Sequence, residues 1–193
     1  MNSHIVIKDC YKTYRHDQDK ARTPEETVAW VKERLQKLKI SILAETQRID
    51  TGRLNIPVYI SLCGDDATRL TGTKKQMGKG ATPIQSEASA VMELMERFSF
   101  FSFIRQSDFP LRSYGEVAPE AISPEILKQS VYDDTTPTEL CRAFLQDLPM
   151  RWSRAANLTR GVDQWVPIDW FYLINEYNGP ASGNTMEEAI LQS

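Results

Sequence analysis

The sequence has few of the residues that bind transition metals or form covalent cross-links. It contains three cysteines and two histidines in 193 residues. Cys10, Cys63 and Cys141 are odd in number and do not form a C-x-x-C pair, which predicts neither a disulfide framework nor a zinc site. His4 and His16 both lie in the N-terminal segment and are too few for a histidine-based metal site.

The chain also lacks a long apolar run, a signal peptide and an excess of positive charge. No run of about 18 apolar residues is present, so we expect no membrane partner and a cytoplasmic location. The formal net charge of −3 argues against a nucleic-acid partner, because phosphate backbones need a concentrated basic face. A hydrophobic content of 41% is ordinary for one globular domain or a part of a larger one.

The most informative stretch is a glycine-flanked lysine loop that leads directly into a long helical pattern, over residues 77–103. Thr82 suits the N-cap of a helix, and Pro83 suits the first helical position. Gln85 completes a capping box with Thr82, because it stands three residues after the cap. These local signals predict a helix that begins at Pro83 and continues to about residue 103.

This predicted helix carries one narrow polar stripe. At about 100° per residue, Ser86, Ser89, Glu96 and Arg97 fall within roughly 60° of Glu93. Two carboxylates at positions i and i+3 repel each other, and a cation is the usual remedy. The residues alone leave two interpretations open, a solvated face with a local ion pair or a wall of a polar site. Apart from Glu87 near the helix start, where a carboxylate suits the dipole, the rest of the circumference is apolar: Ala88, Val91, Met92, Leu94, Met95 and Phe98.

The loop and helix together resemble the first signature of the YcaO family. That signature is GKG followed by a helix with S-A-x-x-E-x-x-E-R, and it is matched by residues 78–80 and 89–97. The resemblance covers most of residues 10–105 and resumes at 178–192. It implies an α+β fold with mixed or antiparallel sheet layers and packed helices. It also implies ATP and Mg²⁺ as cofactors.

The resemblance implies roles for several residues of the stripe and of its surroundings. Glu93 and Glu96 would hold Mg²⁺ on the ATP phosphates, in keeping with the preference of Mg²⁺ for one or two carboxylates plus phosphates. Ser89 and Arg97 would lie beside the nucleotide. Lys79 is either a phosphate-binding or catalytic lysine or a solvated loop residue, and its surroundings do not match a Walker A loop. No catalytic residue is assigned.

Two further candidates precede the first predicted helix or lie within it. The family places nucleotide contacts near Lys20 and Thr27, for which solvated or capping roles are the alternatives. The helix is expected from Pro24 to about Lys39 after a capping box at residues 23–26. Its core positions follow helical spacing: Val28, Val31, Leu35 and Leu38.

The remaining elements are predicted from periodicity and turn residues. Strands are expected at 5–7, 40–46 and 56–62, and Pro57 makes the last of these an edge strand or marks its first residue. Residues 64–76 are predicted to form a polar loop, and residues 122–130 a short helix. A capping box at 136–139 should open a helix with Leu140 and Phe144 facing inward. A hairpin with core aromatic residues is expected from 152–158 and 164–172.

Residues 178–192 resemble the second signature of the family, and they are also similar to the first signature within this chain. Residues 80–85 align with 183–188, glycine to glycine and cap to cap, which suggests two similar loop–helix units facing one ATP site. Asn184, Glu188 and Gln192 would contact nucleotide or metal. By the offset of this echo, a second E-x-x-E-R would fall after residue 193. We therefore expect residues 1–193 to be a partial YcaO domain that lacks its C-terminal part and is inactive alone.

The resemblance supports one leading hypothesis and two alternatives for function. Well-characterised members phosphorylate a peptide amide oxygen while a nucleophile adds to the amide carbon, giving an azoline or a thioamide. The partners would be a peptide or protein substrate, a sulfur-transfer or leader-binding protein, and a second copy in a homodimer. The alternatives are an ATP-binding accessory protein for ribosomal-protein methylthiolation or another sulfur transfer, and an inactive truncated fragment.

Overall fold

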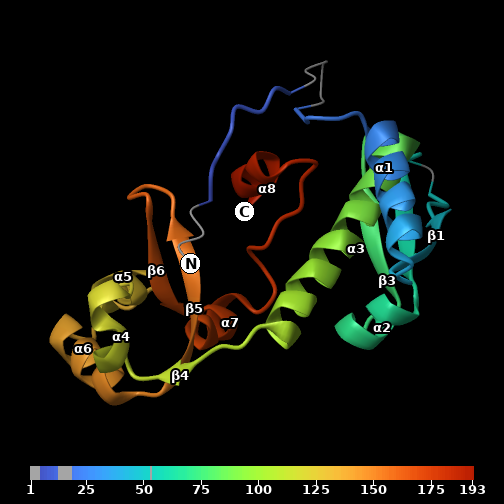
Figure 1. The fold of residues 1–193 in the computed structure, drawn as a ribbon. Coiled ribbons are helices and arrows are strands. Elements are labelled where there is room, and N and C mark those ends of the chain that lie inside the picture. The colour runs from blue at the N-terminus through green and yellow to red at the C-terminus, as the bar shows by residue number, and fades with distance from the viewer. Residues whose placement is uncertain (1–4, 13–18, 53) are drawn as a thin grey trace. The chain divides into compact units, whose positions relative to one another are not determined.

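The computed structural model describes residues 5–12, 19–52 and 54–193, which form two compact units (Figure 1). The larger unit comprises the described residues of 7–106 together with 179–193. The smaller unit comprises residues 107–178 and the described residues that precede residue 7. Helices and antiparallel strands occur in both units, so the α+β fold class is confirmed.

A three-stranded antiparallel sheet forms one layer of the larger unit. Its strands are β1 (Leu43–Arg48), β2 (Val58–Cys63) and β3 (Lys75–Lys79), in the order β1-β2-β3. The first two begin two or three residues later than predicted. Pro57 lies immediately before β2, which is the central strand, so the edge-strand alternative was wrong; the other alternative, that Pro57 marks the first residue of the strand, is correct to within one residue. Because Pro57 stands outside the ladder, its missing N–H removes no strand hydrogen bond.

The predicted polar loop over 64–76 is wrong, because it contains helix α2 (Asp65–Thr71) and the start of β3. Helix α2 buries Ala67 completely and is joined to Ser41, whose hydroxyl accepts the Asp65 N–H at 3.1 Å. Strand β3 has only five residues, mostly polar, so it shows no apolar alternation. The predicted strand at 5–7 is also wrong, since these residues form no strand.

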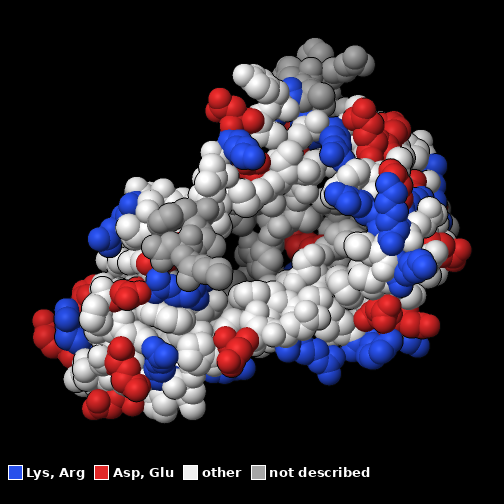
Figure 2. Space-filling view, viewed as in Figure 1, with Lys and Arg blue, Asp and Glu red and all other residues white. Residues whose placement is uncertain are grey.

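Helix α1 (Pro24–Leu38) opens with the predicted capping box between Thr23 and Glu26. Val28, Val31 and Leu35 are buried as predicted. Leu38 is instead 60% exposed, because the helix ends there and Lys39 adopts a left-handed conformation. Acidic side chains gather at the N-terminal end of α1 (Figure 2), where Glu25 and Glu26 suit the helix dipole, and Lys37 in the last turn suits its other end.

Helix α3 (Pro83–Gln106) packs against the sheet and α1. Its predicted capping box is confirmed, since the Gln85 N–H donates to Thr82 Oγ1 at 3.3 Å and the Thr82 N–H donates to Gln85 Oε1 at 3.1 Å. The buried core of the larger unit is formed by side chains of α1, α2 and α3 and by the residue that precedes β1: Val31, Leu35, Ile42, Ala67, Val91 and Leu94.

The smaller unit surrounds a second core centred on Trp152, which is fully buried and donates its indole N–H to the Arg112 carbonyl at 2.9 Å. Its antiparallel strands are β4 (Leu111–Arg112), β5 (Met150–Asn157) and β6 (Val162–Pro167). Its helical segments are α4 (Tyr114–Val117), the 3-10 turn η1 (Ala118–Glu120), α5 (Pro124–Gln129), α6 (Thr138–Asp147) and α7 (Ile168–Asn175).

Three predictions in the smaller unit need correction, although α5 confirms the predicted short helix. The second hairpin strand ends at Pro167, where α7 begins, so residues 168–172 are helical. Helix α6 follows Pro137 without a side-chain cap. Leu140 and Phe144 are 60% and 66% exposed, whereas Leu145 is 4% exposed and faces the core. The helical period was therefore correct and its phase was wrong.

The chain ends in α8 (Met186–Gln192), which belongs to the larger unit. The N-cap Thr185 accepts the Glu188 N–H, and its hydroxyl lies 3.3 Å from the Cys10 thiol. The Lys8 N–H donates to Glu187 Oε1 at 2.9 Å. These contacts give the short helix the tertiary support that it needs. Within the described ranges, the chain forms no helix that is both long and apolar enough to cross a bilayer.

Candidate nucleotide-binding site

One cavity of about 590 Å³ in the larger unit is lined by all the predicted nucleotide and metal residues; we call it the polar cavity. Its walls come from the segment before α1, the start of α1, the β3–α3 loop, the polar stripe of α3, and the C-terminal segment with α8. The structure thus brings together residues that are far apart in sequence: Lys20, Thr27, Lys79, Ser89, Glu93, Glu96, Arg97, Asn184, Glu188 and Gln192.

Close packing of α3 on β3 sets the direction of the stripe. A Cβ on Gly78 would lie 2.1 Å from the Ala90 nitrogen, so only glycine allows this approach. The Ser86 hydroxyl is buried within 3.0 Å of the Pro57 carbonyl and 2.8 Å of the Gly78 carbonyl. Ser86 therefore faces the sheet instead of the cavity, although it lies on the same helical face as Glu93.

The carboxylates of α3 form ion pairs with an arginine of the same helix. Arg97 Nη1 lies 3.5 Å from Glu96 Oε1, and Arg97 Nη2 lies 3.9 Å from Glu93 Oε1. Burial raises the pKa of the Glu96 carboxyl; Arg97 opposes that shift, the charge of Glu93 adds to it, and the Ser182 amide opposes it. The local ion pair of the first interpretation is present, but Glu96 and Arg97 are each only 17% exposed and line a cavity, so the stripe is not simply a solvated face.

A hydrogen-bonded network forms the opposite wall. The Glu188 side chain is 9% exposed and accepts the Ala21 N–H at 3.0 Å. Lys20 Nζ lies 3.6 Å from Glu188 Oε1. The Thr27 hydroxyl lies 2.8 Å from Asn184 Oδ1. These contacts join α8 to the segment that leads into α1, so the cavity wall is held by interactions between distant parts of the chain.

The two loop–helix units predicted from the internal echo have matching local geometry. A Cβ on Gly80 would lie 2.6 Å from the Ser86 nitrogen, and a Cβ on Gly183 would lie 2.5 Å from the Ala189 nitrogen. Each glycine precedes a threonine cap by two residues, and each therefore lets its loop fold tightly over the first turn of the helix.

The comparisons with known proteins agree with this geometry. Residues 77–193 match the family model described as YcaO cyclodehydratase, ATP- and Mg²⁺-binding. The chain belongs to the YcaO family. This confirms the resemblance drawn from residues 78–97 and 178–192, and with it ATP and Mg²⁺ as the predicted cofactors.

Two solved structures share the YcaO fold with this chain. One is described as a heterocyclase in complex with substrate and cofactor, with a TM-score of 0.64 and 23% identity, covering 98% of this chain and 29% of that one. The other is YcaO from Methanopyrus kandleri bound with AMPPCP and Mg²⁺, with a TM-score of 0.54 and 24% identity. The match covers 90% of this chain and 42% of that one. At these identities, the likeness shows the fold.

A protein of Methanothermobacter thermautotrophicus (strain Delta H), described as uncharacterized, is 28% identical over 186 residues. The match covers 86% of this chain and 42% of that protein. The chain thus spans well under half of the length of each of these relatives.

The donor set of the polar cavity fits a magnesium ion bound to a nucleotide. Within the part of the chain that the structure describes, no group of three or more His, Cys, Asp or Glu side chains is arranged to hold a metal by itself. Glu93 and Glu96 nevertheless offer oxygen ligands side by side, and Mg²⁺ completes its octahedron with phosphates and water. Lys20 and Lys79 supply positive charge elsewhere on the walls.

Sequence reasoning missed three residues with polar side chains that line the polar cavity: Arg22, Gln85 and Ser182. Ser182 hydrogen-bonds to Glu96 through its backbone amide, so its side-chain type carried no signal. Gln85 was assigned only its capping role. Arg22 lies two residues after Lys20, and this closeness in sequence could have identified Arg22 as a residue of the polar cavity.

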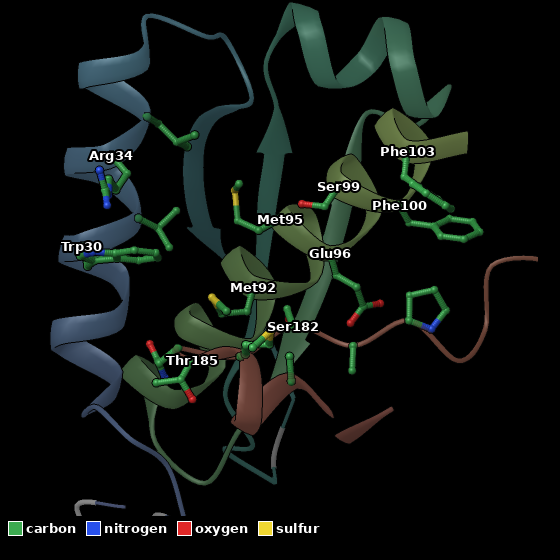
Figure 3. Close-up of a pocket in the computed structure, with 18 of the residues that line it drawn as sticks. Trp30, Arg34, Met92, Met95, Glu96, Ser99, Phe100, Phe103, Ser182 and Thr185 are labelled. Carbon is green, nitrogen blue, oxygen red and sulfur yellow. The ribbon is translucent and has the colours of Figure 1, made fainter. Parts of the chain in front are cut away.

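A second cavity of about 720 Å³ adjoins the first and is largely apolar; we call it the apolar cavity. It shares Met92, Glu96, Ser182 and Asn184 with the polar cavity. Figure 3 shows Glu96 projecting from α3 toward the segment that carries Ser182, with Trp30 and Arg34 on α1. Glu96 therefore stands at the boundary between a polar and an apolar space.

Proposed function

We propose that this chain supplies the Mg·ATP-binding part of a YcaO enzyme that activates a peptide backbone amide by phosphorylation. The observation that carries this proposal is the half-buried Glu93–Glu96 pair on the wall of a cavity that also holds Lys20 and Lys79. Carboxylates for a metal ion and cations for phosphates are both needed to bind Mg·ATP. The family assignment supports the same ligands.

In the proposed reaction, the amide oxygen bonds to the γ-phosphorus as the bond from that phosphorus to ADP breaks. A nucleophile adds to the amide carbon, and loss of phosphate then leaves an azoline or a thioamide. When bound, Mg²⁺ would offset the negative charge of the phosphates. Glu93 and Glu96 would hold the ion, while Lys20 and Lys79 would orient the phosphate chain by charge.

Other parts of this proposal concern the substrate, the partners and the location. The peptide substrate is supported by a structural relative described as bound to substrate and cofactor. A sulfur-transfer or leader-binding partner, a homodimer and a cytoplasmic location stay predictions. Because the relatives are much longer, we assign Mg·ATP binding to this chain and amide phosphorylation to the whole protein.

Calorimetric titration of this chain with AMPPCP, with and without Mg²⁺, tests the proposal. Glu93→Gln should weaken Mg²⁺-dependent binding by about tenfold or more, or about 1.4 kcal/mol, because the amide lacks the charge that holds the ion. Binding without Mg²⁺ should change little. Circular dichroism should show an unchanged fold, since Glu93 lies on the cavity wall.

Glu87→Gln is a matched control on the same helix. Glu87 accepts from Thr46 Oγ1 at 2.7 Å and from Lys32 Nζ at 2.9 Å, and it does not line the polar cavity. This variant should bind Mg·AMPPCP like wild type. Failure of wild type to bind Mg·AMPPCP would overturn the proposal, and equal affinities of wild type and Glu93→Gln would remove Glu93 from the metal site.

A further inference from the structure

The polar cavity has four basic side chains on its walls: Lys20, Arg22, Lys79 and Arg97. Two of them have carboxylate partners, since Lys20 lies near Glu188 and Arg97 bridges the carboxylates of α3. Within the described ranges, Arg22 and Lys79 have no carboxylate within ion-pair distance. Among the described residues, no carboxylate neutralises these two charges, so they face an anion bound in the cavity.

Arg22 is held in place by an aromatic ring. Its Cζ lies 4.8 Å from the centroid of the Trp30 ring, which belongs to the second turn of α1. The capping box at Thr23 sets the path of the chain between the two residues. A guanidinium stacked on an aromatic face keeps its N–H donors in the plane, where they suit the paired oxygens of a phosphate.

We propose that Arg22 is a phosphate-binding residue of the nucleotide site and that Trp30 positions it. This inference rests on the proposed function, because it assigns the anion to the phosphate chain of the nucleotide. A planar fork with several donors binds phosphate oxygens through two parallel hydrogen bonds, whereas a lysine acts as a point charge. Arg22 thereby fixes the orientation of the phosphates, and Lys79 adds charge.

The same ring offers a matched control. Arg34 also lies over Trp30, with its Cζ 5.6 Å from the centroid, but it lines the apolar cavity and not the polar one (Figure 3). Arg34→Gln and Arg22→Gln change the net charge equally, and each removes one cation from the same ring. Only Arg22→Gln removes donors from the polar cavity.

The test measures the dissociation constant of Mg·AMPPCP for this chain at several salt concentrations. Arg22→Gln should raise it about tenfold or more, and Arg34→Gln less than about twofold. The salt dependence of binding should flatten in Arg22→Gln, because one screened charge contact is lost. Arg22→Lys should restore part of the affinity, since it keeps the charge without the fork.

The role of Trp30 is tested with the same ligand. Trp30→Leu should weaken binding because Arg22 loses its stacking surface, and Trp30→Phe should restore affinity because it keeps an aromatic face. Wild-type binding with equal affinities of Arg22→Gln and Arg34→Gln would overturn the role of Arg22 and leave the proposed function intact. Absence of wild-type binding would overturn both.

Discussion

Arg97 Nη1 lies 3.5 Å from Oε1 of Glu96, and each of these side chains is only 17% exposed. The arginine occupies the position of a counter-ion for a carboxylate that burial makes costly to ionise. Because Glu93 shares the same guanidinium, one cation offsets only part of the charge of two carboxylates on the wall of the polar cavity. The protein therefore keeps both carboxylates close together before any divalent ion binds.

Arg97→Gln should lower the stability of the metal-free chain and increase the stabilisation by Mg²⁺. Without the guanidinium, the repulsion between Glu93 and Glu96 is no longer offset. We expect a loss of about 1 kcal/mol, or about 2–4 °C in Tm for a chain of this size. Thermal melts with and without millimolar Mg²⁺ measure this change. An equal response to Mg²⁺ in wild type and variant would contradict the counter-ion role.

Gly78→Ala should severely destabilise the larger unit. The new methyl group would lie 2.1 Å from the Ala90 nitrogen and 2.4 Å from the Ser86 carbonyl oxygen, both of which are backbone atoms of α3. The helix would have to move away from β3, at a cost of about 1–3 kcal/mol or more. Urea denaturation measures the loss.

Gly52→Ala is the control for that substitution. A Cβ at Gly52 would meet no atom within 4 Å, and its φ is not positive. This variant should unfold at the same urea concentration as wild type. Similar midpoints for Gly78→Ala and Gly52→Ala would mean that the close contact between α3 and β3 is not required.

Acid stability should depend on Asp50, which follows β1. Arg48 donates to its carboxylate at 2.7 and 2.8 Å, and the Val58 N–H donates at 3.0 Å. These hydrogen bonds, with that from Arg48 first, lower the pKa of Asp50 from 3.8 to about 2. Because the folded state has the lower pKa, this stabilisation is complete above pH 3.8 and is lost as the pH falls toward about 2.

Asp50→Asn should remove this component of the acid response. Its Tm should lie below that of wild type at neutral pH, and the two values should converge as the pH falls from 3.8 toward about 2. Differential scanning calorimetry at several pH values measures both curves. A constant difference across this range would show that the Asp50 carboxylate does not carry the effect.

Helices α1 and α3 of the larger unit could be predicted from sequence because their signals are local, whereas α2, whose N-cap Gly64 has no side chain to cap it, was missed. Thr23 with Glu26 and Thr82 with Gln85 specify the starts of α1 and α3 through hydrogen bonds within one turn. Strand β3 could not be predicted in this way. Its polar residues pair with β2 through backbone groups, and that pairing depends on a partner distant in sequence.

The smaller unit shows where periodicity is insufficient. The spacing of Leu140 and Phe144 correctly indicates a helix, but which face is buried depends on the packing of Leu145 against the core. In the same way, the β-forming residues around Trp170 favour a strand, yet Pro167 ends β6 and α7 begins at Ile168. Tertiary contacts override propensity at both places.

The candidate site could be assembled from sequence only through the family signatures. Periodicity placed Glu93 and Glu96 on one stripe, but it did not distinguish a solvated face from a cavity wall. The contact of Arg22 with Trp30 escaped prediction because it depends on how the chain turns into α1. The amide of Ser182 escaped because its contribution is made by the backbone.

The hydrogen bond from the Ala21 N–H to Glu188 spans 167 positions of the chain, and residues 107–178 of the smaller unit lie between these residues in sequence. The entropy of closing such a long loop grows only with the logarithm of its length, so doubling the insert would cost about 0.6 kcal/mol. Insertions in exposed loops within 107–178 should therefore disturb the larger unit far less than one added methyl group at Gly78.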